Sequence, residues 1–336
     1  MKRIVFLAPS VKPITKDLDY GGAELCLLNL VECLSEKGYE IVVYAPKESN
    51  FGDKVEVIPT IEANENWQNE ESVYSKFVND IFDSKNDIII SFEHDGIFLR
   101  NDYPIIQKIH GLTTWDNLGN IQLNSKLVFE SQYQLTYSFF KWGELLPNST
   151  CINIGINLND YKPTLDKKDY ALSFGLIQPH KGHEQAIKLF RGYLRDYVSE
   201  LIIAGEDQFV ADLKYPFKFK KLCEGYDGVR YLGRVSKKKK IDLMSKAKVV
   251  LLMFQIPEAY SIILTEALAS ATPVITTSIP VIHELRSLDD KLHPILFPNE
   301  IDKLSYPELN NDCLTFAQKH FSRELMAERW EKFINS

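Results

Sequence analysis

The feature that most constrains this chain is a repeated alternation of short apolar runs with longer amphipathic segments. Residues 23–37 place leucines and a valine at helical intervals, and Gly38 follows where a helix-terminating glycine belongs. Strands are predicted at residues 3–8, 40–45, 87–92, 105–109 and 126–129. Strands that alternate with helices form a parallel sheet covered on both faces, so the first half predicts one such sheet.

A second series of the same kind follows a polar segment, residues 157–168, which contains Pro163 and is the best linker candidate. Strands are predicted at 170–174, 200–204, 229–232, 248–254 and 273–277, and helices at 184–193, 238–247, 262–270, 280–288 and 322–334. In the last helix, Leu325, Trp330 and Phe333 are the expected anchors.

These patterns predict an α/β protein with two Rossmann-like domains facing each other across a cleft. The expected division is 1–160 for the first domain, 169–315 for the second, and 316–336 for a terminal helix that packs back on the first. Ligands of open parallel sheets bind at the carboxyl ends of the strands, so that edge should hold the site.

Length and charge narrow the class further. A chain of 336 residues suits two domains, and a net charge of −7 disfavours a general nucleic-acid binder. No apolar run approaches the roughly 20 residues of a membrane helix, and the first residues are expected to form a strand rather than a signal peptide. Five scattered cysteines predict neither disulfides nor zinc, which favours a cytoplasmic chain. Peripheral contact with the inner membrane face through a local patch stays open.

The strongest motif is a pair of glutamates, Glu258 and Glu266, around the start of the helix predicted at 262–270. A helix N-terminus at a strand end attracts anions, and a carboxylate can accept hydrogen bonds from two vicinal hydroxyls. Glu258 could therefore face a sugar hydroxyl, and Glu266 a ribose. The alternative is structural: a helix-start charge and a solvated helix face.

A second motif runs from Phe174 to Gly182 between a predicted strand and helix. Lys181 suits a diphosphate, and Gly182 allows a close backbone approach. A plain loop with a surface lysine is the alternative. A third motif, Gly21-Gly22, could expose backbone N–H groups to a phosphate or sugar, or merely form a turn. It is not a G-x-G-x-x-G fingerprint, which disfavours a nicotinamide dehydrogenase.

Other polar residues favour structural interpretations or stay undecided. The run Lys237–Lys240 is predicted to be a solvated helix face. His94 and Asp95 follow a predicted strand and either line an acceptor site or form a turn. His180 and His183 lack the carboxylate and cysteine neighbours of a metal site, and no metal is predicted.

Taken together, these motifs resemble the family 4 retaining glycosyltransferases, which have the GT-B fold. The resemblance extends over nearly the whole chain. Gly21-Gly22 is similar to the family's first glycine loop, Gly175 to Gly182 to its phosphate loop, and Glu258 and Glu266 to its paired glutamates, which have seven residues between them. His110 is similar to a histidine that the family keeps near the sugar. Residues 231–235 resemble a loop near the nucleotide base, and residues 322–334 a terminal crossover helix.

The resemblance implies a retaining, metal-independent hexosyltransferase that takes a sugar from a UDP or GDP donor. The acceptor would be a saccharide or lipid-linked glycan, as in polysaccharide biosynthesis, with no nucleic acid and no further cofactor. It implies a front-face displacement in which the leaving phosphate helps to deprotonate the acceptor. The implied catalytic residues are His110, Lys181 and Glu258. The implied donor-binding residues are Gly21, Gly22, Gly175, Lys181, Gly233, Arg234, Tyr260, Ser261, Ile262 and Glu266.

Two positions depart from the family pattern. Leu176 stands where the family has an arginine, so one of two cations for the diphosphate is missing at its usual place. Ser261 replaces a glycine, but serine is a competent helix N-cap. Because of Leu176, a non-catalytic nucleotide-sugar-binding subunit stays open, as does an epimerase of the same fold.

Overall fold

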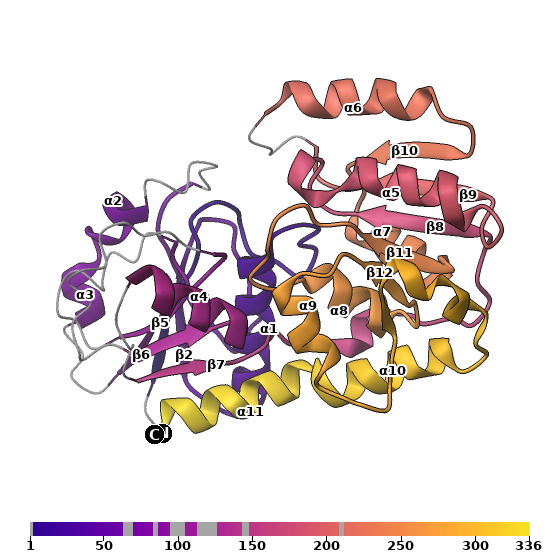
Figure 1. Ribbon diagram of the computed structural model, residues 1–336. Helices are drawn as coiled ribbons and strands as arrows, with labels where there is room; N and C mark the ends of the chain where they lie inside the picture. Colours follow the sequence, from indigo (N-terminus) through magenta and orange to yellow (C-terminus); the bar gives the residue numbers. More distant parts are fainter. Residues whose placement is uncertain are drawn as a thin grey trace. The chain divides into compact units, whose positions relative to one another are not determined.

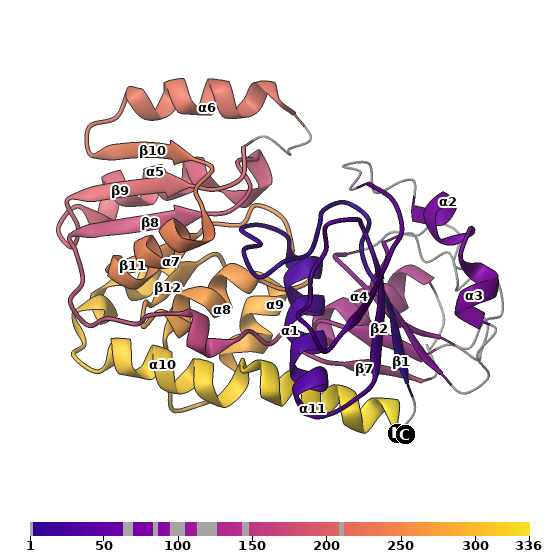
Figure 2. The same cartoon turned by 180° about the vertical axis from the view of Figure 1, so that it is seen from behind.

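The structure, a computed structural model, describes residues 3–62, 70–82, 87–94, 105–112, 126–142, 148–207 and 212–336. It divides the chain into two compact units. Unit 1 comprises Met1–Ile156 and Arg323–Ser336, and unit 2 comprises Asn157–Ser322. Each is a parallel-sheet α/β domain, as the alternation of apolar runs predicts (Figures 1 and 2).

Unit 1 is built on a sheet with the order β3-β2-β1-β4-β5-β6-β7, in which every neighbouring pair is parallel. Its strands are β1 (Ile4–Leu7), β2 (Ile41–Ala45), β3 (Glu56–Pro59), β4 (Ile88–Ser91), β5 (Ile106–Lys108), β6 (Lys126–Phe129) and β7 (Ser149–Cys151). Its helices are α1 (Gly22–Glu36), α2 (Glu70–Tyr74), α3 (Val78–Phe82), α4 (Gln132–Trp142) and α11 (Arg323–Ile334). The central strands are buried because helices lie on both sides of the sheet.

Helix α1 ends as the sequence predicts. Gly38 has φ of +90°, and its N–H donates to the carbonyl of Ser35. Such a left-handed residue satisfies carbonyls left over at a helix end, and glycine adopts it without steric strain. The chain then turns directly into β2, which places the carboxyl ends of β1 and β2 at the same edge of the sheet.

Helix α11 is held on unit 1 by apolar contacts and ion pairs. Trp330 is fully buried and stacks on Phe92, with 6.0 Å between ring centroids. Arg323 pairs with Glu32 and Glu36 of α1 at 3.0 Å. The predicted anchors were only partly right: Trp330 is buried, whereas Leu325 and Phe333 are half-buried. Met326 is a buried contact instead.

Unit 2 is built on a parallel sheet with the order β10-β9-β8-β11-β12-β13. Its strands are β8 (Tyr170–Phe174), β9 (Glu200–Ala204), β10 (Val229–Gly233), β11 (Val249–Leu252), β12 (Val274–Thr276) and β13 (Ile295–Leu296). Its helices are α5 (His183–Leu189), α6 (Lys214–Glu224), α7 (Lys237–Lys246), α8 (Ile262–Ala269), α9 (Pro280–Arg286) and α10 (Leu309–His320). Shorter turns are η4 (Leu158–Asp160), η5 (Pro179–Lys181), the π-helical η6 (Phe190–Leu194) and η7 (Pro298–Ser305).

Strand β8 lies in the middle of the unit 2 sheet, between β9 and β11. Because all the strands are parallel, the loops that follow β8, β9, β10 and β11 leave the same edge. Those loops carry the phosphate-loop motif, Glu206, Arg234 and Glu258, respectively. The topology thus gathers most of the predicted donor-binding residues at one edge.

Candidate functional site

The loop after β8 is shaped by glycines that approach neighbouring backbone. Gly182 has φ of +76°, and a Cβ there would overlap the carbonyl oxygen of Met253 at the end of β11. Gly205, with φ of +151°, lies equally close to the carbonyl of Gly175. Gly182 was predicted to permit a close approach, and the group it approaches is the adjacent strand. These close backbone contacts fix the position of the loop that carries Lys181.

His183, the first residue of α5, ties this loop to the sheet. Its Nδ1 lies 2.8 Å from Ser173 Oγ and its Nε2 lies 3.0 Å from the carbonyl oxygen of Leu176. The Nε2–H therefore donates to Leu176, and Nδ1 accepts from the serine hydroxyl. Burial lowers the pKa of His183 to about 4, so the ring is neutral at pH 7. His183 therefore ties the loop to strand β8.

Lys181 and Glu258, predicted separately, form an ion pair. Lys181 Nζ donates to both carboxylate oxygens of Glu258, at 2.8 and 2.9 Å. The two side chains are 19% and 17% exposed, and Nζ also lies 5.7 Å from the centroid of the Phe254 ring. Both side chains keep part of their surface in solvent, so an incoming anion can reach the cation.

The helix that follows Glu258 begins as predicted. Ser261 is the N-cap of α8, and its hydroxyl accepts the N–H of Leu264 at 3.3 Å. Ile262 is the first helical residue, so the helix N-terminus lies four residues after Glu258. Tyr260 is buried with its ring edge-on to Phe321, at 6.5 Å between centroids. These contacts hold the start of α8 in place beside the ends of β11 and β12.

Glu266 is 1% exposed, so the alternative that it lies on a solvated helix face is wrong. Its Oε1 accepts hydrogen bonds from Lys240 Nζ at 2.6 Å and from the hydroxyl of Tyr161 at 2.8 Å. Its Oε2 is also buried and accepts no hydrogen bond from the described residues. A buried acceptor without a donor is unfavourable, so a ligand hydroxyl at Oε2 would be stabilising.

The lysine run before Glu266 was predicted to be solvated, and this is only half right. Lys238 and Lys239 are exposed, but Lys240 is buried against Glu266, and Lys237 pairs with Asp160 at 3.0 Å. Lys240 shares a helix face with the buried Leu243 and Met244. The sequence could have indicated that Lys240 is buried, because residues i, i+3 and i+4 lie on one side of a helix and the residues three and four positions after Lys240 are apolar.

At the end of β10, Gly233 and Arg234 lie beside acidic residues of the β9 loop. Gly233 has φ of +65°, and a Cβ there would lie 2.5 Å from the carboxylate of Asp207. Arg234 Nε lies 3.4 Å from Glu206, whose side chain is fully buried. Strand β9 separates β10 from β8, so Arg234 and Lys181 follow strands that are two apart on the same edge. The structure thus supplies a second cation there, although Leu176 does not.

In unit 1, the glycine pair opens helix α1. Gly21 is its N-cap with φ of +129°, and Gly22 is its first residue. A Cβ on Gly21 would lie 2.5 Å from Oε2 of Glu24, so this carboxylate folds back over the loop. The sequence had suggested backbone N–H groups as the chemical feature here. A buried carboxylate, which prefers hydroxyl or cationic partners, accompanies them.

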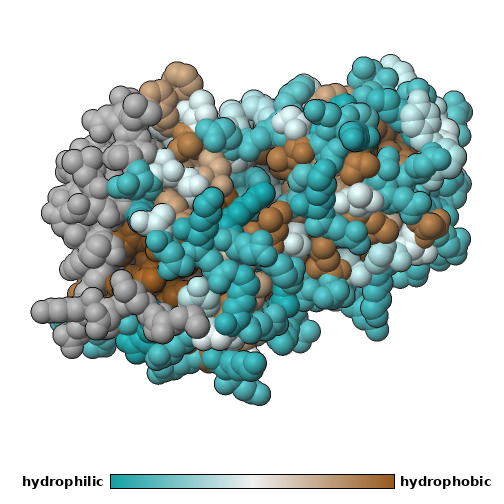
Figure 3. Space-filling view, turned by 90° about the horizontal axis from the view of Figure 1, so that it is seen from below, coloured by the Kyte–Doolittle hydropathy of each residue, from teal (hydrophilic) through white to brown (hydrophobic). Residues whose placement is uncertain are grey.

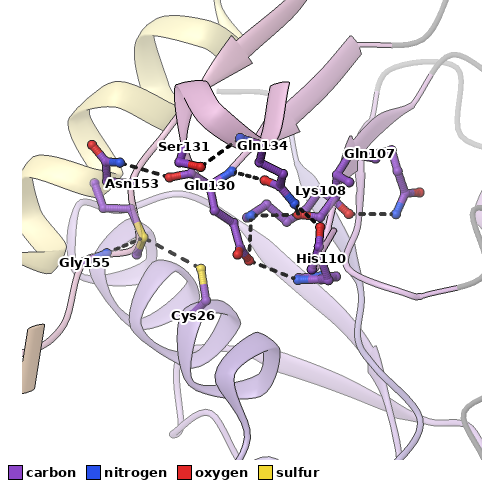
Figure 4. A network of polar contacts seen from close by, with 12 residues as sticks. Cys26, Gln107, Lys108, His110, Glu130, Ser131, Gln134, Asn153 and Gly155 are labelled. Carbon is purple, nitrogen blue, oxygen red and sulfur yellow. Dashed lines mark hydrogen bonds and ion pairs between the residues drawn. The ribbon is translucent and has the colours of Figure 1, made fainter. Parts of the chain in front are cut away.

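His110 follows β5 and belongs to a buried network (Figure 4). Its Nδ1 lies 3.5 Å from Glu130, which also pairs with Lys108 Nζ at 3.1 Å. Burial lowers the pKa of His110 to about 4. Burial alone would raise the pKa of Glu130, but the charge of Lys108 and the His110 contact outweigh it and lower that pKa to about 2. At pH 7 the network therefore holds a neutral imidazole beside an ion pair.

His94, at the end of β4, lies against His110, with 5.2 Å between ring centroids. Its Nδ1 lies 3.4 Å from Glu70, whose carboxylate also accepts the N–H of Ser10 at 2.6 Å. Burial alone would lower the pKa of His94, but Glu70 outweighs it and raises that pKa. Strands β1, β4, β5 and β6 are adjacent, so these groups line one edge of the unit 1 sheet. Asp95, named with His94, lies outside the described residues.

The described residues contain no group of histidine, cysteine, aspartate or glutamate side chains placed to hold a metal ion. Nor does that part of the chain include a helix long and apolar enough to cross a membrane. His110 and the glycine pair belong to unit 1, and the other predicted site residues belong to unit 2.

Comparisons with known proteins agree with this arrangement. Residues 158–299 match the family model described as glycosyl transferases group 1, a range that includes Lys181, Glu258 and Glu266. Over 130 residues the chain is 32% identical to the O-antigen chain mannosyltransferase RfbU of Salmonella typhimurium. That alignment covers 39% of this chain and 35% of RfbU, so the chain matches about a third of its curated relative.

Similar solved structures cover the whole chain. Sucrose-phosphate synthase from Thermosynechococcus elongatus has a TM-score of 0.80 at 15% identity, covering 100% of this chain and 98% of that one. Anabaena HepE in complex with UDP and glucose has a TM-score of 0.76 at 16% identity, covering 100% of both chains. AviGT4, a glycosyltransferase involved in avilamycin A biosynthesis, has a TM-score of 0.75 at 19% identity, covering 100% and 97%. The chain therefore has the GT-B fold, and its second unit carries the match to group 1 glycosyltransferases.

Proposed function

We propose that this protein is a glycosyltransferase that moves a hexose from a UDP or GDP donor to a saccharide or lipid-linked acceptor, with retention of anomeric configuration. The observation that carries the proposal is the buried Oε2 of Glu266, which lacks a hydrogen-bond donor among the described residues, on α8, the helix that follows the partly exposed Lys181–Glu258 pair. A nucleotide sugar offers the matching groups: vicinal ribose hydroxyls, a diphosphate and a sugar.

In this proposal Lys181 exchanges partners when the donor binds. Its ammonium leaves the Glu258 carboxylate, at 2.8 Å in the structure, for the diphosphate, while the N–H groups at the start of α8 meet the same charge. Glu258 then faces the sugar hydroxyls. Arg234 is the second cation of the edge, in place of the arginine absent at Leu176.

The proposed reaction is a front-face displacement. The bond from the anomeric carbon to the phosphate oxygen breaks, the acceptor oxygen bonds to that carbon, and the acceptor proton passes to the leaving phosphate. His110 orients the sugar as a neutral imidazole, since its pKa lies at about 4. The diphosphate charge is met by Lys181 and backbone, so we propose that the reaction needs no divalent metal.

The test is transfer by Lys181→Ala, assayed with UDP- and GDP-hexoses and a saccharide acceptor in the presence of EDTA. We expect wild-type activity in EDTA and a loss of at least about 100-fold in kcat/KM for the variant, the scale of one lost electrostatic donor. Lys188→Ala is the matched control, because Lys188 lies exposed on the next helix, α5, and should behave as wild type.

Near-normal kcat/KM in folded Lys181→Ala would overturn this assignment, and activity restored only by magnesium or manganese would overturn metal independence. Two other candidates remain, because Lys181 is already neutralised by Glu258 and Leu176 carries no charge. Donor binding without transfer or hydrolysis would indicate a non-catalytic subunit. A changed donor sugar without added acceptor would indicate an epimerase.

A further inference from the structure

Helix α6 has one buried face and one face that its own unit leaves uncovered. Pro216, Phe219 and Cys223 are buried on the inner side. Phe219 packs its ring on Tyr215 at 5.7 Å and against the edge of Tyr231 at 6.0 Å between centroids. These contacts fix the rotation of α6, so its opposite side is a defined outer surface. In Figure 1 it lies along the edge strand β10.

That outer surface combines lysines with exposed apolar side chains. Leu213, just before the helix, is 69% exposed, and Phe217, four residues later, is 62% exposed. Residues four apart lie on the same side of a helix, so the two form one ridge. Lysines flank the ridge at positions 214, 218, 220 and 221, all exposed. Lys221 Nζ lies 4.5 Å from the centroid of the Phe217 ring.

The four ammonium groups have no carboxylate partner within the described chain, where Lys221 contacts only an aromatic ring. By contrast Lys248, an exposed lysine elsewhere on unit 2, pairs with Asp169 at 2.6 Å. The single acidic residue of α6, Glu224, is its last residue. The face is thus strongly basic in a chain whose net charge is −7.

Two arginine side chains lie at the C-terminal end of α6. Gly225, which caps the helix, lines an open pocket of about 330 Å³ together with Arg191, Arg195, Tyr226 and Asp227. The Arg191 guanidinium lies 4.5 Å from the centroid of the Tyr226 ring, while Arg195 pairs with Asp227 at 3.6 Å. Both arginines are exposed, so the basic region extends beyond the helix itself.

We propose that the outer face of α6, defined by Leu213, Lys214, Phe217, Lys218, Lys220 and Lys221, docks on a membrane surface rich in anionic lipids. Phe217 and Leu213 enter the boundary between headgroups and acyl chains, and the lysines contact lipid phosphates. Charge complementarity selects the anionic surface.

The apolar ridge distinguishes this partner from a nucleic acid or an acidic protein segment. Lysines alone would suffice for either of those, and neither requires an exposed leucine four residues from an exposed phenylalanine. On the face shown in Figure 3, hydrophobic residues of unit 2 are scattered among hydrophilic ones, the usual state of a soluble surface. The docking does not depend on the reaction proposed above.

The test is flotation of the full chain with vesicles of phosphatidylcholine containing about 30% phosphatidylglycerol, against vesicles of phosphatidylcholine alone. We expect binding to the anionic vesicles only, weakened at about 0.5 M salt because salt screens exposed charges. Lys218→Glu/Lys221→Glu should weaken binding at least about tenfold, since each lysine near such a surface contributes severalfold. Leu213→Ser/Phe217→Ser should also weaken it, while keeping the salt dependence.

The matched control is Lys238→Glu/Lys239→Glu, the same charge change on exposed lysines of α7. It should bind like the wild type, and thermal shifts with UDP and GDP should be equal in all variants. The proposal is overturned if the wild type ignores anionic vesicles, or if neutral vesicles bind equally well. It is equally overturned if the charge reversals on α6 and on α7 weaken binding to the same extent. Wild-type binding by Leu213→Ser/Phe217→Ser would also overturn it, because a purely electrostatic partner does not need the apolar ridge.

Discussion

The charged side chains at the carboxyl edges of the two sheets differ in their burial and in their partners. In unit 1, Lys108 is fully buried and its ammonium is held by Glu130 at 3.1 Å, with His110 beside the same carboxylate. In unit 2, the Lys181–Glu258 pair is partly exposed, and the buried Glu266 keeps one oxygen without a donor from the described residues. The Lys108–Glu130 pair of the first edge is buried, whereas the second edge leaves groups that an outside molecule can engage.

The difference teaches where binding chemistry should be sought. A buried ion pair that is satisfied by its neighbours fixes geometry, and losing one member is severe because the other charge is stranded. A partly exposed pair is screened by water more than a buried one, so it contributes less stability, and its partners can be exchanged. Variants of the Lys108–Glu130 pair should therefore act mainly on folding, and variants of the unit 2 edge mainly on ligand binding and turnover.

The largest effect is expected from Lys108→Met. The substitution leaves the Glu130 carboxylate buried without its cation, a change that typically costs about 3–5 kcal/mol of the free energy of unfolding. Urea unfolding followed by circular dichroism measures it. Lys54→Met, at an exposed position in unit 1, is the control and should change stability by less than about 0.5 kcal/mol.

A double variant, Lys108→Met/Glu130→Leu, sharpens this prediction. Removing both charges relieves the stranded carboxylate, so the double variant should be more stable than Lys108→Met alone. If Lys108→Met loses less than about 1 kcal/mol, the pair is not the structural element that its burial indicates.

The next prediction distinguishes the roles of Glu258 and Glu266 in unit 2. Glu258→Gln should lower kcat more than it raises the donor KM, since it faces the sugar, where charge and ring shape change during reaction. Glu266→Gln should mostly weaken donor binding, by about 1.5–3 kcal/mol, because its proposed ribose partner does not change. Steady-state kinetics with donor titration distinguish the two patterns.

The reverse pattern would contradict this assignment. If Glu266→Gln leaves the donor KM unchanged while Glu258→Gln raises only that KM, the donor lies in the opposite orientation. If both variants behave as wild type, the paired glutamates are structural charges and the glycosyltransferase proposal loses its main support. Circular dichroism of each variant controls for folding, above all for Glu266, which is buried against Lys240.

The strands were the most predictable part of the fold. Central strands such as β8 and β9 are buried on both faces, so they appear as continuous apolar runs, and their predicted bounds match the structure. Short or half-buried elements were missed, among them β7 and α6. Pro216 disguises α6, but it lies in the first helical turn, where its missing N–H breaks no bond.

The chemistry of the edges was less predictable than the strands. The topology brings Lys181 to Glu258 across 77 positions of sequence, and no local pattern shows that they pair. Lys108 within an apolar run was a usable signal, because a lysine inside a buried strand needs a buried partner. Its partner, Glu130, follows the next strand, and the register of β5 with β6 brings the two together.

The smallest expected effect is the pH dependence of stability, which should differ between the units. His183 in unit 2 has its pKa lowered to about 4 by burial, so the unfolded chain binds its proton more readily. The stability that this shift contributes is fully present above pH 6.5 and is lost as the pH falls toward 4. At pH 5 the loss amounts to about 2 kcal/mol of the free energy of unfolding. In unit 1, His110 shifts the same way, but His94 has a raised pKa beside Glu70, and its contribution is lost as the pH rises. The two histidines of unit 1 therefore oppose each other, whereas His183 acts without such a counterweight.

Hydrogen exchange of the intact protein at pH 7 and pH 5, corrected for intrinsic rates, should show a greater loss of protection in β8 and α5 than in β4 and β5. His183→Gln should remove most of the loss in unit 2. Equal losses in both units, or an unchanged loss in His183→Gln, would show that other groups govern the acid response.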